Sequence, residues 1–151
     1  MNQHISTRAV VLEKPEQLGL HDLDLADPCD DDVVVDVEWS GISTGTEKLL
    51  YTGAMPMFPG MGYPLVPGYE SVGRVTEAGP NSGHHVGERV FVPGARCFGE
   101  VRGLFGGAAS RLVVPGQRVF KVSDELGESA VLLALAATAY HAVAGGGKRD
   151  P

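Results

Sequence analysis

Cysteine is scarce in this chain, which contains only Cys29 and Cys97 among its 151 residues. The two lie far apart and in no Cys-x-x-Cys spacing, so the sequence does not indicate a disulfide framework. Scarce cysteine suits a reducing compartment, and residues 1–8 lack the apolar run of a secretory signal. We therefore expect a cytoplasmic protein.

Positive charge and long hydrophobic runs are also scarce. The chain has 12 Lys and Arg residues against 19 Asp and Glu residues, a formal net charge of −7. This argues against a nucleic-acid partner, because phosphate binding needs a basic face. The longest apolar run, 130–144, is too short to cross a bilayer and is interrupted by Thr138, Tyr140 and His141. The sequence predicts one soluble domain without a membrane-spanning segment.

Glycine and proline, by contrast, are abundant, with 21 and 10 residues scattered along the chain. Such scatter is typical of short strands joined by tight turns. Alternating or β-branched residues predict strands at 8–13, 18–25, 32–40, 70–77, 88–92 and 110–114. One of the predicted turns contains His84 and His85, which we expect to be solvated. The predicted fold class is mostly β with a few helices, arranged as a compact barrel-like sheet.

A first helix is predicted at residues 44–51. Thr44 and Glu47 have the three-residue spacing of a capping box, and the helix should stop at Gly53. The simplest role of Glu47 is therefore to cap this helix.

A second helix is predicted at residues 129–144. It is rich in Leu and Ala and apolar nearly all round, so we expect it to be buried on most sides and to end at the glycines 145–147. A buried helix in last place, with nothing left to cover it, indicates that residues 145–151 lead toward a further domain.

Four motifs carry a family resemblance. Residues 40–47 read SGISTGTE, 64–75 read PLVPGYESVGRV, 87–90 read GERV and 107–115 read GAASRLVVP. In this order they resemble the catalytic domain of the medium-chain dehydrogenase/reductase family, along nearly the whole chain. The resemblance implies a GroES-like, partly open β-barrel over residues 1–144, with 145–151 as a linker toward a dinucleotide-binding domain. It also implies an NAD-dependent alcohol dehydrogenase.

Residues 39–50 and 58–71 resemble one branch of that family more closely. That branch oxidises the 3-(1-hydroxyethyl) group of a (bacterio)chlorophyllide to 3-acetyl in bacteriochlorophyll biosynthesis. The resemblance implies a chlorophyllide-type tetrapyrrole as substrate and leaves open whether the full-length enzyme forms a homo-oligomer. The G-x-G-x-x-G turn of a dinucleotide site is absent. NAD should therefore be bound mainly by a domain absent from this chain, and we expect the chain alone to be inactive.

Two departures from the family motif concern zinc. The family binds catalytic zinc through a cysteine and a histidine, and this chain has Ser43 and Tyr69 at those positions. Neither is a good zinc ligand, and the neighbouring Glu70 alone does not make a site. The sequence therefore predicts no metal and a zinc-independent reaction.

Alcohol oxidation without zinc must still remove the hydroxyl proton and stabilise the developing alkoxide. The candidate catalytic residues are a hydroxyl chain of Ser43, Thr46 and Tyr69. Glu70 is a further candidate, which would orient that chain. As a base, Tyr69 would need a pKa lowered from about 10 by a cation, and Lys48 is the nearest candidate in the sequence. Alternatively, Tyr69 fills the space of the metal or contacts the substrate, and Glu70 ties down a loop.

Further candidates concern the cofactor and the substrate. Thr44 and Thr138 match positions at which relatives contact the nicotinamide, although Thr138 could instead bond back to its own helix. The Met- and aromatic-rich loop 55–61 predicts an adaptable apolar wall for a flat tetrapyrrole. The candidate substrate-binding residues are Trp39, Met57, Phe58 and Tyr63. The alternative is an ordinary packed loop.

Two other functions fit the same residues. A quinone-reductase-like oxidoreductase also lacks zinc and would use NADPH with a quinone or an enone. A non-enzymatic module would use the same barrel to hold an apolar ligand, and would bind pigment stoichiometrically without a partner domain.

Overall fold

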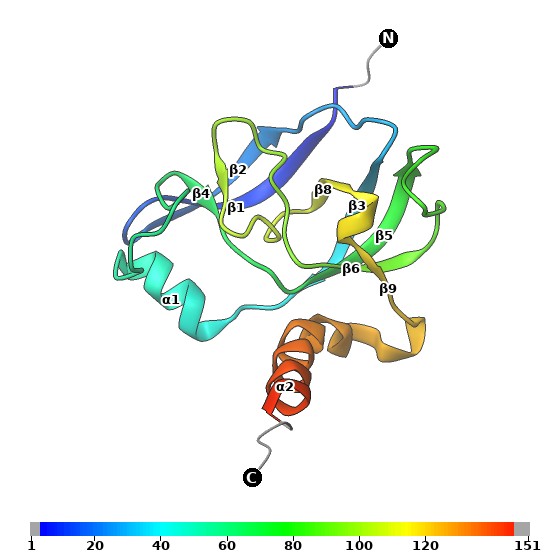
Figure 1. The fold of residues 1–151 in the computed structure, drawn as a ribbon. Helices are drawn as coiled ribbons and strands as arrows, with labels where there is room; N and C mark the ends of the chain where they lie inside the picture. Colours follow the sequence, from blue (N-terminus) through cyan, green and yellow to red (C-terminus); the bar gives the residue numbers. More distant parts are fainter. Residues whose placement is uncertain (1–3, 147–151) are drawn as a thin grey trace.

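Two β-sheets and two α-helices form the part of the chain that the structure, a computed structural model, describes, residues 4–146 (Figure 1). The strands are β1 (Ser6–Lys14), β2 (Gln17–Asp24), β3 (Asp32–Ser40), β4 (Leu65–Val66), β5 (Ser71–Ala78), β6 (Arg89–Val92), β7 (Arg102–Gly103), β8 (Arg111–Pro115) and β9 (Phe120–Lys121). The α-helices are α1 (Thr44–Thr52) and α2 (Leu133–Gly146), and two 3-10 segments are η1 (Gly116–Arg118) and η2 (Asp124–Leu132).

The strands form one sheet in the order β2-β1-β4-β7 and another in the order β8-β3-β5-β6-β9. Within the second sheet all pairs are antiparallel, and β3 lies between β8 and β5. Neither sheet closes on itself, so the mostly β, partly open barrel predicted from the sequence is confirmed. All six predicted strands are present, with ends displaced by two residues at most.

The main core cluster draws on both sheets. Val11 of β1 and Val33, Val34 and Val35 of β3 are almost inaccessible, as are Val90 and Val92 of β6. Three consecutive valines can be buried together because β3 is central and both of its faces are covered. This packed centre fixes the strand ends from which the loops of the candidate site extend.

The N-cap of helix α1 lies one residue earlier than the sequence suggests. The N-cap is Ser43, not Thr44, and its side chain makes no capping hydrogen bond. Its hydroxyl is instead bonded to the Tyr69 hydroxyl. The predicted capping box at Thr44 is therefore wrong, because the side chain at the true N-cap is engaged elsewhere. The predicted stop at Gly53 is confirmed by its left-handed φ of 74°.

The expectation that the last helix is buried is wrong for this chain. Helix α2 lies below both sheets in Figure 1 and projects away from them. Only its beginning and the end of η2 pack on the second sheet, through Ala130, Val131 and Ala134. Farther along, Leu135 and Val143 are 53% and 77% exposed. The helix also continues through Gly145 and Gly146, and the remainder of the predicted linker lies outside the described residues.

The buried Arg89 fixes the segment that leads into α2. Its guanidinium donates to Gly127 O (2.7 Å), Ser123 O (3.2 Å) and the Glu38 carboxylate (2.9 Å). These bonds tie η2 to β6 and β3, and so they set where α2 starts.

By length and composition alone, the 22-residue helical run Asp124–Gly145 could cross a membrane. Its continuity is broken at Gly127, whose φ of 51° and ψ of −141° are not helical. The regular α-helix has 14 residues. That corresponds to about 21 Å, less than the roughly 30 Å of a hydrocarbon core.

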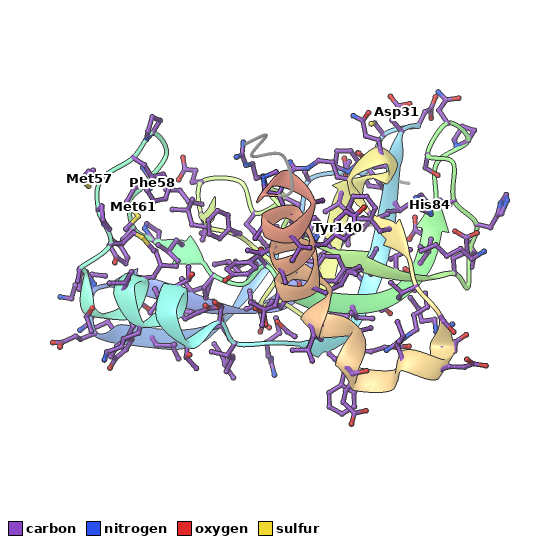
Figure 2. All side chains as sticks on the ribbon, turned by 60° about the horizontal axis from the view of Figure 1, so that its bottom comes forward. Asp31, Met57, Phe58, Met61, His84 and Tyr140 are labelled. Carbon is purple, nitrogen blue, oxygen red and sulfur yellow. The ribbon has the colours of Figure 1, made fainter. Side chains whose placement is uncertain are left out.

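The predicted solvation holds for His85, which is exposed. It is wrong for His84, which is labelled in Figure 2 and is half-buried. His84 Nδ1 lies 2.9 Å from Glu88 Oε2, and Nε2 lies 3.0 Å from Gly116 O. The ring therefore joins the turn before β6 to η1. A backbone carbonyl distant in the sequence supplies one of its partners, which is why turn composition does not reveal it.

Candidate functional site

Three hydroxyl groups meet where α1 begins. The Ser43 hydroxyl is hydrogen-bonded to the Tyr69 hydroxyl, and Thr46 Oγ1 lies 3.4 Å from Tyr69 Oη. Tyr69 is held by Gly68, which has a φ of 99° and could not carry a Cβ, because that atom would lie 2.9 Å from the backbone nitrogen of Ala108. The predicted cluster of Ser43, Thr46 and Tyr69 is therefore brought together in the structure.

Thr46 and Tyr69 open onto a large apolar pocket of about 750 Å³. The other residues that line it are Met55, Phe58, Phe91, Pro93, Phe105, Phe120, Leu133, Ala134 and Ala137. Tyr69 packs edge-on against Phe105, with ring centroids 5.6 Å apart and planes at 80°. Hydrogen bonds in such a low-dielectric wall are stronger than in water. The pocket therefore offers a few hydroxyls as fixed polar contacts within an apolar surface.

No charged side chain lines this pocket among the described residues. Lys48, the cation nearest to Tyr69 in the sequence, is exposed and lines a different hollow, together with Thr44 and Glu47. The neighbours of Tyr69 are therefore two hydroxyl groups and the Phe105 ring. Among the described residues no cation lines the pocket beside it.

Glu70 is 4% exposed but does not line the pocket. Its carboxylate lies against Gly41, and its backbone oxygen accepts a 2.8 Å hydrogen bond from the Gly41 N–H. Across residues 4–146 no hydrogen bond joins its side chain to the three hydroxyls, and Oε1 is buried without a hydrogen-bond partner. The structure thus does not bring Glu70 to the hydroxyl chain that it was predicted to orient.

Glu47 is a half-buried carboxyl that the sequence assigned only to capping. Burial raises its pKa, and the charge of Glu70 raises it further, whereas the backbone N–H groups of Ser43 and Glu47 lower it. Its Oε2 has no hydrogen-bond partner within the described part of the chain. Two carboxyl groups therefore influence each other near the start of α1.

The donor set at the hydroxyl cluster does not fit zinc. Ser43 and Tyr69 hydroxyls bond to each other, and neither is a good zinc ligand. Within residues 4–146 there is no group of three or more His, Cys, Asp or Glu side chains that could hold a metal ion. We therefore derive no step through a metal.

Of the predicted substrate-binding residues, only Phe58 lines the apolar pocket. Figure 2 shows Met57, Phe58 and Met61 on one loop, and Met57 is 82% exposed. Trp39 is 53% exposed on β3. Tyr63 packs with Leu12 and Leu50, and its hydroxyl donates to Leu50 O, as in an ordinary packed loop.

Sequence reasoning missed most of the pocket wall. Leu133, Ala134 and Ala137 share a face of α2, so helical spacing could have grouped them. Phe105 and Phe120 stand alone in glycine-rich or irregular sequence, and only the folded chain shows that they meet.

The two predicted cofactor contacts lie apart from the pocket wall. Thr44 is exposed and lines the same hollow as Lys48. Thr138 is exposed on α2, and its hydroxyl donates to Ala134 O at 3.1 Å, the local bond that was the alternative to cofactor contact. Each hydroxyl oxygen retains capacity to accept a further hydrogen bond.

The chain is similar in sequence to known alcohol dehydrogenases. The alcohol dehydrogenase GroES-like domain family matches residues 29–124. A protein of Cereibacter sphaeroides named 2-desacetyl-2-hydroxyethyl bacteriochlorophyllide A dehydrogenase is 56% identical over 144 residues, covering 92% of this chain and 45% of the relative. A Rhodobacter capsulatus protein of the same name is 54% identical, with 93% and 45% covered. This chain thus spans less than half the length of these curated relatives.

Solved structures share the fold. A probable oxidoreductase from Mycobacterium abscessus is 29% identical with a TM-score of 0.74, covering 93% of this chain and 43% of that one. The 2R,3R-butanediol dehydrogenase from Bacillus subtilis has a TM-score of 0.73 at 23% identity, with 91% and 47% covered, which shows a common fold alone.

Proposed function

This chain belongs to the alcohol dehydrogenase GroES-like domain family, and from that membership we propose that it is the catalytic domain of a chlorophyllide-oxidising dehydrogenase. The reaction is the oxidation of the 3-(1-hydroxyethyl) group of a (bacterio)chlorophyllide to 3-acetyl, with NAD and without zinc. The names of the two curated relatives support the substrate class. The observation that carries the proposal is the hydroxyl cluster of Tyr69, Ser43 and Thr46 at the wall of a large apolar pocket.

The pocket suits a flat macrocycle. A tetrapyrrole presents two broad apolar faces, and the pocket is lined almost entirely by aromatic and aliphatic side chains. The few hydroxyls can then select the position of one polar substituent, because an unpaired polar group is costly in such surroundings. We place the substrate carbinol beside Tyr69.

In this arrangement the chain's own residues orient the alcohol and carry its proton. The carbinol hydroxyl donates to Tyr69 Oη, whose own O–H donates to Ser43, so the proton that moves onto Tyr69 stays hydrogen-bonded to the oxygen on which charge develops. The hydroxyl proton leaves through Tyr69 to Ser43, each oxygen accepting one proton as it releases another, and passes to solvent. The aliphatic and aromatic wall excludes water from the reacting carbon.

NAD, when bound, supplies the hydride acceptor. We propose Thr44 and Thr138 as its contacts within this chain. We place most of its site in the part of the relatives that this chain does not match.

The test is a chimera in which residues 1–144 replace the matching segment of the Cereibacter sphaeroides relative. It is incubated with 3-(1-hydroxyethyl) bacteriochlorophyllide and NAD, with and without a strong zinc chelator, and the red-most absorption band is followed. We expect a shift that survives the chelator. A shift abolished by the chelator refutes the zinc-free reaction. No shift, with the unaltered relative active in parallel, refutes the substrate, and quinones with NADPH are then assayed.

A further inference from the structure

A second hollow, of about 490 Å³, adjoins the apolar pocket. Phe58 and Phe105 line both, so the two hollows share part of their wall. The second hollow differs in charge, because Arg96 and Arg102 line it and no Asp or Glu residue does. This local positive charge stands in a chain whose net charge is −7. We call it the arginine hollow.

The guanidinium of Arg96 has no hydrogen-bond or ion-pair partner within residues 4–146. Arg96 is also exposed. Arg102 donates from Nη1 to Tyr63 O at 3.1 Å, which leaves its remaining N–H groups free to donate. The arginines that form ion pairs with carboxylates, such as Arg111 with Asp36, line no part of this hollow. The arginine hollow therefore presents cations without their counter-ions.

The hollow is also open to a ligand. Gly60 and Gly99 lie in its wall with φ values of 91° and 61°, and a Cβ at either position would meet nothing within 4 Å. No side chain of the described residues therefore fills the space beside these two glycines.

We propose that the arginine hollow binds a carboxylate of the substrate, with Arg96 and Arg102 as its partners, while the ring system lies in the apolar pocket. The proposal rests on the function proposed above. A chlorophyllide carries its propionate as a free carboxylate, whereas in a chlorophyll that carboxylate is esterified with a long-chain alcohol. The arginine hollow thus makes the enzyme select the free acid over its esters.

Charge and geometry support this assignment. A guanidinium offers parallel N–H donors that match the two oxygens of a carboxylate. Because both arginines are exposed, solvent screens the interaction, and its effect on affinity should be about tenfold rather than several orders of magnitude. Phe58 and Phe105 can hold the ring edge from which the propionate extends, since they belong to both cavities.

The test is a fluorescence titration of this chain with 3-(1-hydroxyethyl) bacteriochlorophyllide and with its methyl ester. We expect the acid to bind about tenfold more tightly than the ester, with a preference that shrinks at high salt. Arg96→Gln should reduce the preference by weakening the binding of the acid alone, with Arg102 left as the one remaining cation of the hollow. Arg118→Gln, in the exposed arginine of η1 that lines neither cavity, is the matched control and should change nothing.

The outcomes separate the two proposals. Equal binding of acid and ester by the unaltered chain overturns the carboxylate site and leaves the pigment site standing. Equal loss of both ligands in Arg96→Gln, or the same loss in Arg118→Gln, also overturns it. If NAD competes with the acid but not with the ester, the anion is a cofactor phosphate and the assignment to the substrate is overturned. No binding of either pigment refutes the proposed function itself.

Discussion

At the scale of single residues, the Tyr69 hydroxyl is the group on which the proposed chemistry depends. Tyr69→Phe removes that hydroxyl and keeps the ring against Phe105. We expect kcat of the chimera to fall about 10²-fold with little change in KM, because the lost hydrogen bond forms to charge that develops during the reaction. Steady-state kinetics with the bacteriochlorophyllide measures both constants.

Thr46→Val is the companion variant, since Thr46 Oγ1 lies 3.4 Å from the Tyr69 hydroxyl and Thr46 also lines the pocket. We expect it to cost less than Tyr69→Phe. A Tyr69→Phe enzyme with unchanged kcat would remove Tyr69 from the chemistry and leave it as a residue that shapes the pocket.

The half-buried carboxyl of Glu47 gives a prediction about stability. Burial raises its pKa, so the folded chain holds a proton that the unfolded chain releases, and stability falls as pH rises above the ordinary glutamate value. Glu47→Gln removes this loss and should raise the free energy of unfolding by roughly 0.5 kcal/mol at pH 7, the scale of a solvent-screened charge interaction. Urea unfolding at pH 7 and at pH 4 measures the difference, which should be smaller at pH 4. A variant that is less stable than the parent at pH 7 would mean that the Glu47 charge is stabilising.

The hydroxyl cluster was within reach of sequence reasoning, and most of the pocket was not. Ser43 and Tyr69 stand in motifs whose ligand positions converge in the family, so their meeting follows from the resemblance. Glu70 follows Tyr69 directly, but its buried side chain lies against Gly41 instead of in the pocket. Met57 and Trp39 are exposed because an apolar side chain on a surface loop or strand end need not face a cavity.

At the scale of elements, the link between the turn before β6 and η1 depends on His84 and Glu88. The hydrogen bond from His84, followed by that from Lys121, lowers the pKa of Glu88 from 4.5 to about 2. A carboxyl with a lowered folded pKa stabilises the fold above pH 4.5, and this contribution is lost as pH falls from 4.5 toward 2. Glu88→Gln should therefore lower the urea midpoint at pH 6 and do so progressively less at pH 4 and pH 3.

Glu100→Gln is the control for that experiment, because Glu100 is exposed and makes no hydrogen bond or ion pair among the described residues. It should leave the midpoint unchanged at each pH. If Glu88→Gln lowers the midpoint equally at pH 6 and pH 3, the loss is one of packing and not of charge.

Strands and helices with a strong local sequence pattern could be predicted from the sequence. Short strands that form only by pairing with a distant strand could not. The run of three valines in β3 identifies a central strand without further context. By contrast, β4, β7 and β9 have two residues each and exist only because distant segments pair with them, as Leu65 does with Arg102. The composition of α2 predicts a helix correctly. It does not predict the exposure of that helix, because only the start of α2 packs on the second sheet.

At the scale of the whole molecule, the apolar pocket exists because α2 starts beside the second sheet. Its lining combines residues of β6, β9 and the loop around Phe105 with the first turns of α2, and Thr46, Met55, Phe58, Tyr69 and Pro93 complete it. Arg89 of β6 donates to Ser123 O and Gly127 O and so links β6 to the η2 segment that leads into α2. A ligand in the pocket would therefore contact segments that lie far apart in the sequence and would be sensitive to the face that α2 presents.

Ala137 tests this arrangement, because it lines the pocket while its neighbour Ala136 does not. Ala137→Leu puts a larger side chain into the space assigned to the tetrapyrrole and should weaken pigment binding about tenfold. Ala136→Leu adds the same volume outside the pocket and should bind like the parent. Leucine is nearly as good a helix former as alanine, so neither change should lower stability by more than a few tenths of a kcal/mol. Pigment titration and urea unfolding of both variants provide the measurement. Equal binding by the two would mean that the pigment does not occupy the space between α2 and the sheet.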